Sequence, residues 1–231
     1  MTKIVALLPM KGNSERVKNK NLKDFAGKPL YHRTMETLLG SKYINSVIVN
    51  TDSEDIKADI KRNFNDNVII IDRPYSIKGD YVSMNRIIEY DISIVNADIY
   101  IQSHSTNPLL SVESLNKAME KMFEIVKSNT YDSLFSVTKW QTRLYKEDAS
   151  AYNHNPKELL RTQDLEPLFE ENSNFYIFTK SSFDSAGKKR IGSKPYLFEI
   201  DKIEAVDIDE PQDFVIAESL FKLLRQNHIK S

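Results

Sequence analysis

Residues 7–30 read LLPMKGNSERVKNKNLKDFAGKPL and join an apolar segment to a loop rich in amides and cations. The apolar residues 4–8 predict a strand, and the Gly27-Lys28-Pro29 turn predicts entry into a helix. Between them lie five cations, which are Lys11, Arg16, Lys18, Lys20 and Lys23. Backbone N–H groups and cations in such a loop can face a polyphosphate together. Because the loop follows the first strand of an α/β pattern, we expect it to bind phosphate rather than to be only a solvated surface.

The composition predicts a soluble globular protein with one domain over residues 1–231. Hydrophobic residues make up 40% of the chain and charged residues 28%, and the net charge is −1. This balance argues against binding to nucleic acid or to a membrane surface. The chain has no cysteine, which excludes disulfides and thiolate chemistry and suits the cytoplasm. The segment before the first strand is too short for a signal peptide, and no apolar run reaches membrane-spanning length.

Hydrophobic periodicity alternates between strand and helix over the first 140 residues. The predicted strands are residues 4–8, 46–50, 68–71, 99–102 and 133–138, and the predicted helices are residues 29–39, 54–64, 84–95 and 111–128. The last of these helices is the clearest, with Ser111 as its N-cap and apolar positions at Val112, Leu115, Met119, Met122 and Val126. The alternation predicts an α/β fold with a mostly parallel sheet covered by helices on both faces.

The rhythm breaks at residues 139–168, which are polar with scattered aromatic and basic side chains. We expect this segment to be an ordered excursion from the core, either a small flap or a dimerisation arm. Strands resume at residues 175–179 and 194–200. Pro211 then opens a last helix, whose apolar positions are Phe214, Ala217, Leu220, Phe221 and Leu224.

Familiar catalytic motifs are absent from the sequence. It contains no G-x-G-x-x-G, no G-x-x-x-x-G-K-[ST], no G-x-S-x-G and no HExxH. His104 stands out among the four histidines because it follows a predicted strand at the carboxyl edge of the sheet, where α/β folds bind ligands. A structural role for this single histidine remains the alternative.

Asp207 and Asp209 form the second informative pattern. Residues i and i+2 of a strand share a face, so we expect the two carboxylates to converge while Ile208 points the other way. Two carboxylates that face no cation favour a hard divalent ion such as Mg²⁺. In the alternative, Asp209 caps the helix that begins at Pro211. Together with the basic loop, the pair predicts a nucleoside triphosphate site that needs no covalent nucleophile.

These residues resemble the cytidylyltransferases that activate nine-carbon acidic sugars, namely sialic acid (N-acylneuraminate) and its bacterial relatives legionaminic and pseudaminic acid. That family opens with a strand and a loop of the form A-R-x-x-S-K-x-x-x-x-K-N. In residues 10–21, Ser14, Lys20 and Asn21 match this form. Lys11 stands in place of the arginine, and Glu15 replaces a lysine with Arg16 beside it.

The resemblance extends along nearly the whole chain. The matching segments are Thr51-Asp52, Arg73-Pro74, Gly79-Asp80 with Ser83, Arg161 to Leu165, Asn172 with Tyr176, and Asp207-Ile208-Asp209. Two positions depart from the pattern, because Tyr81 replaces a small residue and Ser173 replaces a glycine. Residues 102–109 resemble L-Q-P-T-S-P-L with one extra residue, so either Gln102 or His104 would take the role of the family's glutamine.

The resemblance implies a reaction in which CTP and an acidic nine-carbon sugar give a CMP-sugar and pyrophosphate, with Mg²⁺ as cofactor. It also implies a Rossmann-like nucleotidyltransferase fold and a homodimer in which residues 139–168 of one subunit complete the neighbour's site. The implied catalytic residues are Lys11, Lys20 and Asp209, and the implied metal ligands are Asp207 and Asp209. The residues implied to bind CTP are Lys11, Asn13, Ser14, Arg16, Lys20, Asn21, Asp80, Ser83, Gln102 and His104. Those implied to bind the sugar are Arg161, Gln163, Asp164, Asn172 and Tyr176.

Two alternatives remain open. An eight-carbon-sugar (Kdo) cytidylyltransferase would favour R-L-P-G-K-P-L after the loop and Q-G-D-E-P later, and this chain has neither. A non-catalytic member of the fold that binds a nucleotide or serves in assembly is the other alternative. The departures at Lys11, Tyr81 and Ser173 are the features that favour it.

Overall fold

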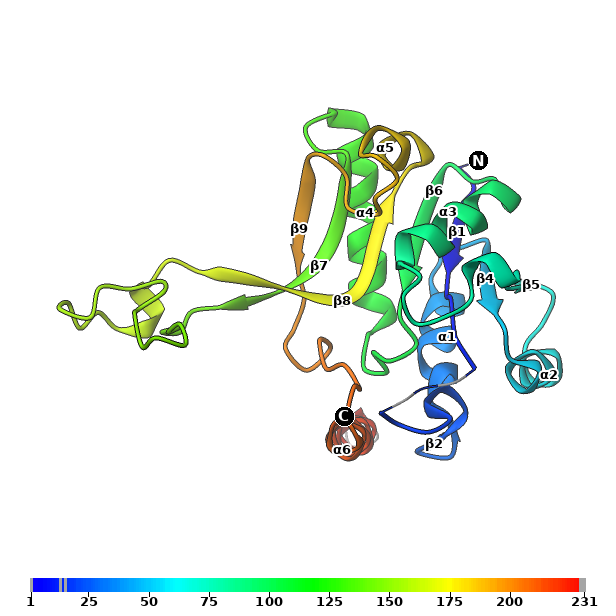
Figure 1. The fold of residues 1–231 in the computed structure, drawn as a ribbon, viewed down its shortest axis with the longest axis horizontal. Coiled ribbons are helices and arrows are strands. Elements are labelled where there is room, and N and C mark those ends of the chain that lie inside the picture. The colour runs from blue at the N-terminus through cyan, green and yellow to red at the C-terminus, as the bar shows by residue number, and fades with distance from the viewer. Residues whose placement is uncertain (1, 13, 15, 229–231) are drawn as a thin grey trace.

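A seven-stranded mixed sheet forms the centre of the protein (Figure 1). The computed structural model describes residues 2–12, 14 and 16–228. The strand order is β5-β4-β1-β6-β8-β7-β9. The strands are β1 (Ile4–Leu7), β4 (Ser46–Thr51), β5 (Val68–Asp72), β6 (Ile99–Ser103), β7 (Ser133–Trp140), β8 (Leu168–Phe178) and β9 (Pro195–Glu199). Strand β8 is antiparallel to its two neighbours, and the other pairings in this sheet are parallel.

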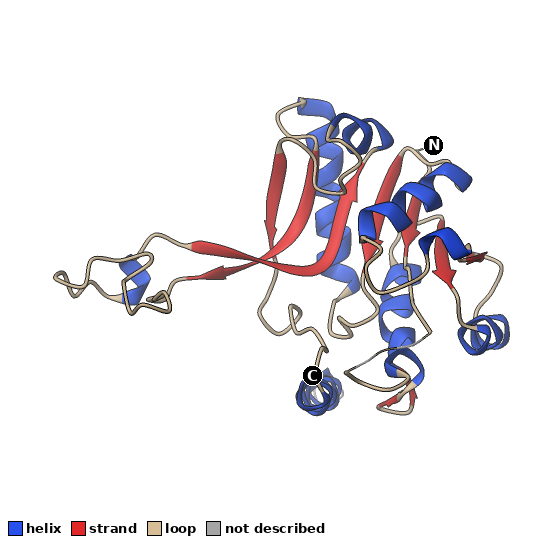
Figure 2. Ribbon diagram, in the orientation of Figure 1, coloured by secondary structure: helices blue, strands red, loops and turns tan. Residues whose placement is uncertain are grey.

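Helices cover both faces of the sheet, as the alternating pattern predicted (Figure 2). They are α1 (Leu30–Gly40), α2 (Glu54–Asn63), α3 (Met84–Ile94), α4 (Val112–Ser128), α5 (Lys180–Ser185) and α6 (Pro211–His228). Side chains of α1, α2 and α4 share one buried cluster with the sheet, and those of α3 and α5 share another. Strands buried on both faces read as continuous apolar runs, which explains why the segment IVAL of β1 is fully apolar.

The remaining elements are short. They are the 3₁₀ helices η1 (Lys20–Leu22), η2 (Tyr75–Ile77) and η3 (Thr162–Asp164) and a two-stranded hairpin of β2 (Asp24–Phe25) and β3 (Lys28–Pro29). Phe25 of this hairpin packs edge-on against Phe214 of α6, with ring centroids 5.5 Å apart. The hairpin therefore ties the basic loop to the C-terminal helix. No helix among the described residues is both long and apolar enough to cross a membrane.

The predicted elements agree with the structure within about two residues at most of their ends. Ser111 caps α4 as predicted, because its hydroxyl accepts a hydrogen bond from Ser114 N at 3.0 Å. The apolar face of α4 was partly wrong: Val126 is 53% exposed and Ile125 is buried in its place. Residues 207–209, for which strand geometry was assumed, have no regular structure. Helix α5 was missed, since its single apolar position, Phe183, gives no helical period.

Strands β7 and β8 continue past the sheet as a twisted ribbon that projects from the body (Figures 1 and 2). Their register shifts between Phe135 and Val137, where β8 carries extra residues opposite β7. Within this bulge, Ser173 has a φ of 59°, in the left-handed region that favours glycine. Bulges bend a strand and increase its twist, so this one turns the ribbon away from the sheet.

A buried polar chain ties the loop after β1 to β4 and α3. Arg73 donates from Nε to Asn50 Oδ1 at 2.8 Å and from Nη2 to Met10 O at 3.2 Å. Asn50 Nδ2 donates to Asp91 Oδ1 at 2.6 Å, and Asp91 Oδ2 has no hydrogen-bond partner. Burial raises the pKa of the Asp91 carboxyl to about 7. The protonated form is therefore favoured in the folded protein below about pH 7.

This pKa predicts how stability depends on pH. The pKa of an unfolded aspartate lies near 4, so the folded state holds an extra proton between about pH 4 and 7, and the free energy of unfolding falls as the pH rises through that window. Asp91→Asn removes this pH-dependent fall in the free energy of unfolding, because asparagine does not titrate. We expect the free energy of unfolding of the variant to gain on that of the wild type by on the order of 1–4 kcal/mol from pH 4 to 7.

Urea unfolding at several pH values measures this gain. The exposed Asp55 of α2 offers a matched control, because the same substitution is made there at a side chain that is open to solvent. A difference between Asp91→Asn and the wild type that stays constant across the window would contradict the prediction.

Candidate active site

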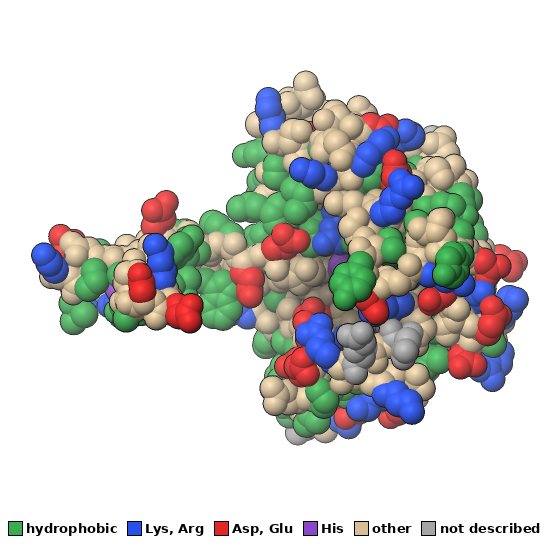
Figure 3. Space-filling model, viewed as in Figure 1, with side chains coloured by type: hydrophobic (Ala, Val, Ile, Leu, Met, Phe, Trp, Pro, Cys, Tyr) green, Lys and Arg blue, Asp and Glu red, His purple; other side chains and the backbone are tan. Residues whose placement is uncertain are grey.

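A cleft of about 480 Å³ opens at the carboxyl edge of the parallel strands. Its walls come from the loop after β1, the segment before α3, the loop after β6, the bulge of β8 and the segment before α6. Residues far apart in sequence therefore meet here. Figure 3 shows basic and acidic side chains side by side around the hollow in the middle of the body. Of the residues predicted to bind CTP, the cleft is lined by Lys11, Ser14, Arg16, Lys20, Asn21, Asp80 and His104.

Lys20 is the most enclosed cation of the basic loop, with 12% of its side chain exposed. Its Nζ donates to the carbonyl of Ile208 at 2.5 Å and lies 3.8 Å from Asp209 Oδ1. Burial lowers the pKa of Lys20, and the carboxylates of Asp209 and Asp207 act in the opposite direction. Lys20 is thus held in place by the C-terminal segment before any ligand arrives.

Lys11 and Arg16 lie nearer the solvent and pair with carboxylates of other segments. Lys11 Nζ is 2.6 Å from Asp80 Oδ1. Arg16 Nη2 is 2.8 Å from Asp209 Oδ1, and its Nη1 is 3.4 Å from Glu210 Oε1. The expectation that the Asp207–Asp209 pair faces no cation was therefore wrong. The loop and the carboxylates meet each other directly across the cleft.

Asp207 and Asp209 both line the cleft although the segment is not a strand. Ile208 between them is fully buried in a cluster with Phe25 and Phe214. Its N–H donates to Thr106 O at 3.0 Å, and its carbonyl accepts from Lys20. One buried side chain and its two backbone bonds thus produce the alternation that was predicted from strand geometry.

The Asp207 and Asp209 carboxylates fit a divalent cation. Asp207 Oδ1 is buried without a hydrogen-bond partner, and burial raises the pKa of this carboxyl. In the part of the chain that the structure describes, no group of three or more His, Cys, Asp or Glu side chains could hold a metal ion. Mg²⁺ is commonly held by one or two carboxylates together with substrate phosphates, so two protein ligands suffice.

Asp213, and not Asp209, caps the start of α6. Asp213 Oδ2 accepts from Asp209 N at 3.1 Å and from Glu210 N at 2.7 Å, so this carboxylate closes the first turn of α6. Negative charge at a helix N-terminus is favourable. The side chain of Asp209 therefore remains in the cleft with Arg16 and Lys20.

Polar side chains fix the path of the basic loop. Asn21 donates from Nδ2 to Lys11 O at 3.1 Å, and its Oδ1 accepts from Ser105 Oγ at 2.7 Å. Gly12 N donates to Asp52 Oδ1 at 2.8 Å. A Cβ at Gly12 would lie 2.8 Å from Ser53 Cβ, so only glycine fits this close approach. Asn13, predicted to contact CTP, lies outside the described residues.

Gln102 and His104 were the two candidates for the role of the family's glutamine, and they occupy different positions. His104 lines the cleft, whereas the fully buried Gln102 lies beneath it and donates to Ser103 O at 2.8 Å. Ser83 is not among the residues that line the cleft. Its hydroxyl accepts from Arg86 N at 3.4 Å and caps α3.

Arg190 is a residue of this region that the sequence did not reveal. It contacts both Gln102 and His104, at 2.5 Å and 3.2 Å from its Nη1. Burial, with smaller contributions from Arg190 and Lys20, lowers the pKa of His104 to about 3. In the sequence Arg190 follows two lysines in a polar turn, so no periodicity or motif separates it from ordinary surface cations.

The residues predicted to bind sugar fall into two places. Asn172 and Tyr176 lie on β8 beside the cleft; Asn172 Nδ2 donates to Thr138 Oγ1 at 3.0 Å, and the Tyr176 hydroxyl bonds Ser173 Oγ at 3.2 Å and Glu171. Arg161, Gln163 and Asp164 lie instead at or beside η3, in the segment that joins β7 to β8 at the end of the projecting ribbon. Arg161 there forms a two-pronged ion pair with Asp164, at 2.7 and 3.0 Å. These three residues do not line the cleft of their own chain.

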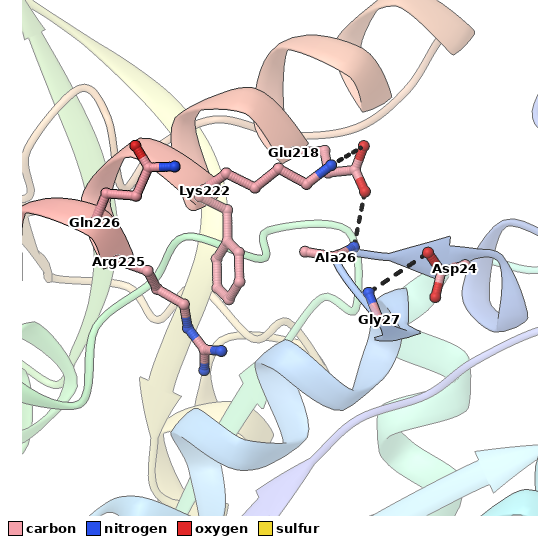
Figure 4. A pocket seen from close by; sticks show the side chains of 8 residues that line it. Asp24, Ala26, Gly27, Glu218, Lys222, Arg225 and Gln226 are labelled. Carbon is pink, nitrogen blue, oxygen red and sulfur yellow. Dashed lines mark hydrogen bonds and ion pairs between the residues drawn. The ribbon is translucent and has the colours of Figure 1, made fainter. Parts of the chain in front are cut away.

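A second hollow of about 400 Å³ lies between the β2–β3 hairpin and α6 (Figure 4). Glu218 spans it, because its carboxylate accepts from Ala26 N at 2.8 Å and pairs with Lys222 at 3.1 Å. These contacts fasten α6 to the hairpin that follows the basic loop. The Glu218 contacts therefore support the segment that follows the basic loop. The hollow shares no lining residue with the cleft.

The protein family described as cytidylyltransferase matches residues 5–229. Among curated proteins, the pseudaminic acid cytidylyltransferase of Campylobacter jejuni subsp. jejuni is 26% identical over 234 residues, which cover 96% of this chain and 97% of that protein. The N-acylneuraminate cytidylyltransferase A of Danio rerio is 31% identical over 223 residues, which cover 93% of this chain and 50% of that protein.

Solved structures show the same fold. The CMP:2-keto-3-deoxy-manno-octonic acid synthetase complexed with CTP has a TM-score of 0.69 at 12% identity, covering 96% of this chain and 99% of that one. This likeness confirms the predicted Rossmann-like nucleotidyltransferase fold. Because the family match spans nearly the whole sequence, the chain belongs to the cytidylyltransferase family.

Proposed function

We propose that the protein transfers the cytidylyl group of CTP to an acidic nonulosonic sugar, such as sialic, legionaminic or pseudaminic acid, and releases pyrophosphate. The observation that carries this proposal is the meeting of the basic loop with Asp207 and Asp209 in one cleft of a chain from the cytidylyltransferase family. The acceptor class follows from the names of relatives that match almost all of this chain, including one matched over nearly its full length.

In the proposed reaction, the anomeric oxygen of the sugar bonds to the α-phosphorus of CTP. The bond from that phosphorus to the bridging oxygen breaks, pyrophosphate leaves with this oxygen, and the hydroxyl proton is released. Lys11 and Lys20 bind the triphosphate and stabilise the charge that develops on it. The carboxylates of Asp80 and Asp209, which pair with Lys11 and Arg16 in the structure, would yield these cations to the phosphates.

Mg²⁺ is the proposed cofactor, and Asp207 and Asp209 would hold it together with phosphate oxygens. When bound, such an ion neutralises charge on the transferring phosphoryl group. The unpartnered Oδ1 of Asp207 supports this assignment, since a buried carboxylate oxygen with no donor has the lone pairs free for a cation. Lys20 and Arg16 would then balance the charge of Asp209 and the phosphates.

We further propose that the protein forms a homodimer through the projecting ribbon, and that the ribbon of each subunit reaches the partner's cleft. Its side chains include apolar groups that are open to solvent, among them Leu159 at 90%, Tyr152 at 61% and Tyr145 at 57% exposure. Exposed apolar surface of this kind favours a protein interface. Arg161 on the same ribbon would bring a guanidinium to the acidic sugar of the neighbouring subunit.

The first prediction tests the reaction itself. Pyrophosphate release should require CTP, Mg²⁺ and an acidic nonulosonic sugar together, and a panel of such sugars should identify the preferred acceptor. Kdo and UTP serve as controls for the eight-carbon-sugar alternative and for base selection. CTP binding without pyrophosphate release on any acidic sugar would favour the non-catalytic alternative.

The second prediction concerns the metal. Asp209→Ala should lower turnover by about 100-fold or more while the fold is kept, because one of two protein ligands is lost. Glu210→Ala is the matched control, since it removes the other carboxylate beside Arg16 and leaves the proposed ligands intact. Near-normal turnover of Asp209→Ala over a Mg²⁺ titration would show that Asp209 serves only as an ion-pair partner.

The third prediction concerns the shared site. Lys11→Ala disables the cleft of its own subunit, and Arg161→Ala disables the projecting ribbon that reaches the neighbouring cleft. Each variant alone should therefore be nearly inactive. Co-expression of the two should restore about one quarter of the wild-type activity, because half of the dimers then carry one intact site. Lys11→Ala co-expressed with Lys20→Ala should restore none. Full activity of Arg161→Ala alone would refute the role of the arm.

A further inference from the structure

Arg190 lies between α5 and β9 and is fixed at both its backbone and its side chain. Its N–H donates to Asn85 Oδ1 on α3 at 3.1 Å. Only 16% of its side chain is exposed. The guanidinium lies over the ring of Tyr176, with its central carbon 3.6 Å from the ring centroid. A cation stacked on an aromatic face at this distance is held by the ring's electrostatic field.

The charge of Arg190 is only partly matched by acidic groups. Glu171 Oε1 lies 3.7 Å from its Nη2, and Gln102 Oε1 accepts from Nη1 at 2.5 Å. The Glu171 carboxylate is itself 44% exposed and is shared with the Tyr176 hydroxyl. A cation that is largely enclosed and has one loosely paired carboxylate is costly for the fold alone. This cost calls for a role beyond packing.

His104 is the member of this group that reaches the cleft. Arg190 Nη1 lies 3.2 Å from His104 Nε2. A guanidinium has donors only, so Nε2 must accept, and the ring proton must lie on Nδ1. The ring is neutral, since burial, Arg190 and Lys20 lower its pKa to about 3. Arg190 thus selects one tautomer of a cleft histidine.

This part of the cleft belongs to the side that joins the ribbon. His104 follows β6, and Ser173 on the bulge of β8 lines the same cleft. Of the cations proposed to bind phosphate, Lys20 is near enough to act on His104, whereas Lys11 pairs with Asp80 and Arg16 with Asp209. A neutral N–H suits a hydroxyl or acyl oxygen, whereas a phosphate would favour a charged ring.

We propose that Arg190 is a positioning residue for the acceptor sugar: it holds His104 as a neutral ring whose Nδ1–H donates to an uncharged oxygen of that sugar. The substrate part of this inference rests on the proposed function, whereas the link from Arg190 to the tautomer does not. Arg190 therefore sets selectivity for the sugar and leaves CTP binding nearly unaffected.

The tautomer is tested first, in the protein without substrates. In ¹⁵N-histidine NMR spectra, with His104 assigned by a His104→Gln variant, we expect the wild type to show a neutral ring protonated on Nδ1. Arg190→Met should shift this signal toward the other tautomer or a mixture. Lys189→Met is the matched control, because it removes a neighbouring charge whose side chain is exposed and should leave the signal unchanged. An unchanged His104 signal in Arg190→Met would overturn the proposal.

The kinetic test uses the preferred acidic sugar. Loss of an oriented hydrogen bond predicts that Arg190→Met raises KM for the sugar by about tenfold or more, with KM for CTP changed less than about threefold. In a His104→Gln background the same substitution should have little further effect. Equal changes in both KM values, or an unchanged KM for the sugar, would overturn the sugar assignment.

Arg190→Lys guards against a folding defect, since lysine keeps the charge and loses the planar fork. It should show an intermediate KM for the sugar with the unfolding midpoint of the wild type. If Arg190→Met unfolds, the ¹⁵N-histidine spectrum and the KM of Arg190→Lys decide together, and a shifted tautomer with a wild-type KM for the sugar would overturn the proposal. A wild type that turns over no acidic sugar would defeat the proposed function, while the NMR comparison would still decide the link between Arg190 and His104.

Discussion

Burial of the Ile208 side chain holds the C-terminal carboxylates against the basic loop. Its side chain packs with Phe25 and Phe214, its N–H donates to the loop after β6, and its carbonyl accepts from Lys20. Three distant segments are therefore joined at one residue. Because the backbone is fixed there, the flanking aspartates have no alternative but to face the cleft. The β2–β3 hairpin and α6 serve this same arrangement, since they supply the aromatic wall around Ile208.

The charges of the cleft are arranged at two levels of rigidity. Lys20 is largely enclosed, and its partners are a backbone carbonyl and a more distant carboxylate, so its position does not depend on a ligand. Lys11 and Arg16 are about half exposed and pair with equally exposed carboxylates. Such surface pairs contribute about 0–1 kcal/mol each, so a polyphosphate can exchange with them at little cost. The ion pairs of Lys11 and Arg16 therefore leave both cations available to an anion in the cleft.

The sequence was sufficient for the alternation of strands and helices, for the family, and for the place of the basic loop at the cleft, because each depends on local order along the chain. It was insufficient where a long-range contact decides the outcome. The convergence of Asp207 and Asp209 was expected from a strand, yet it comes from the burial of Ile208. Arg16 was assigned to the loop, and its pairing with Asp209 depends on tertiary packing. Arg190 gave no signal, since its contacts with His104, Gln102 and Tyr176 form only in the folded chain.

Ser173 shows how a departure from the family pattern is absorbed locally. Its left-handed backbone explains why a glycine suits this position, and a side chain there costs roughly 1–2 kcal/mol. The serine hydroxyl offsets part of this cost through its hydrogen bond with Tyr176, the residue on which Arg190 stacks. The same bulge turns β8 from the cleft wall into the ribbon. One strand therefore links the part of the cleft lined by Ser173 and His104 to the projecting ribbon, so a change in the bulge would affect both together.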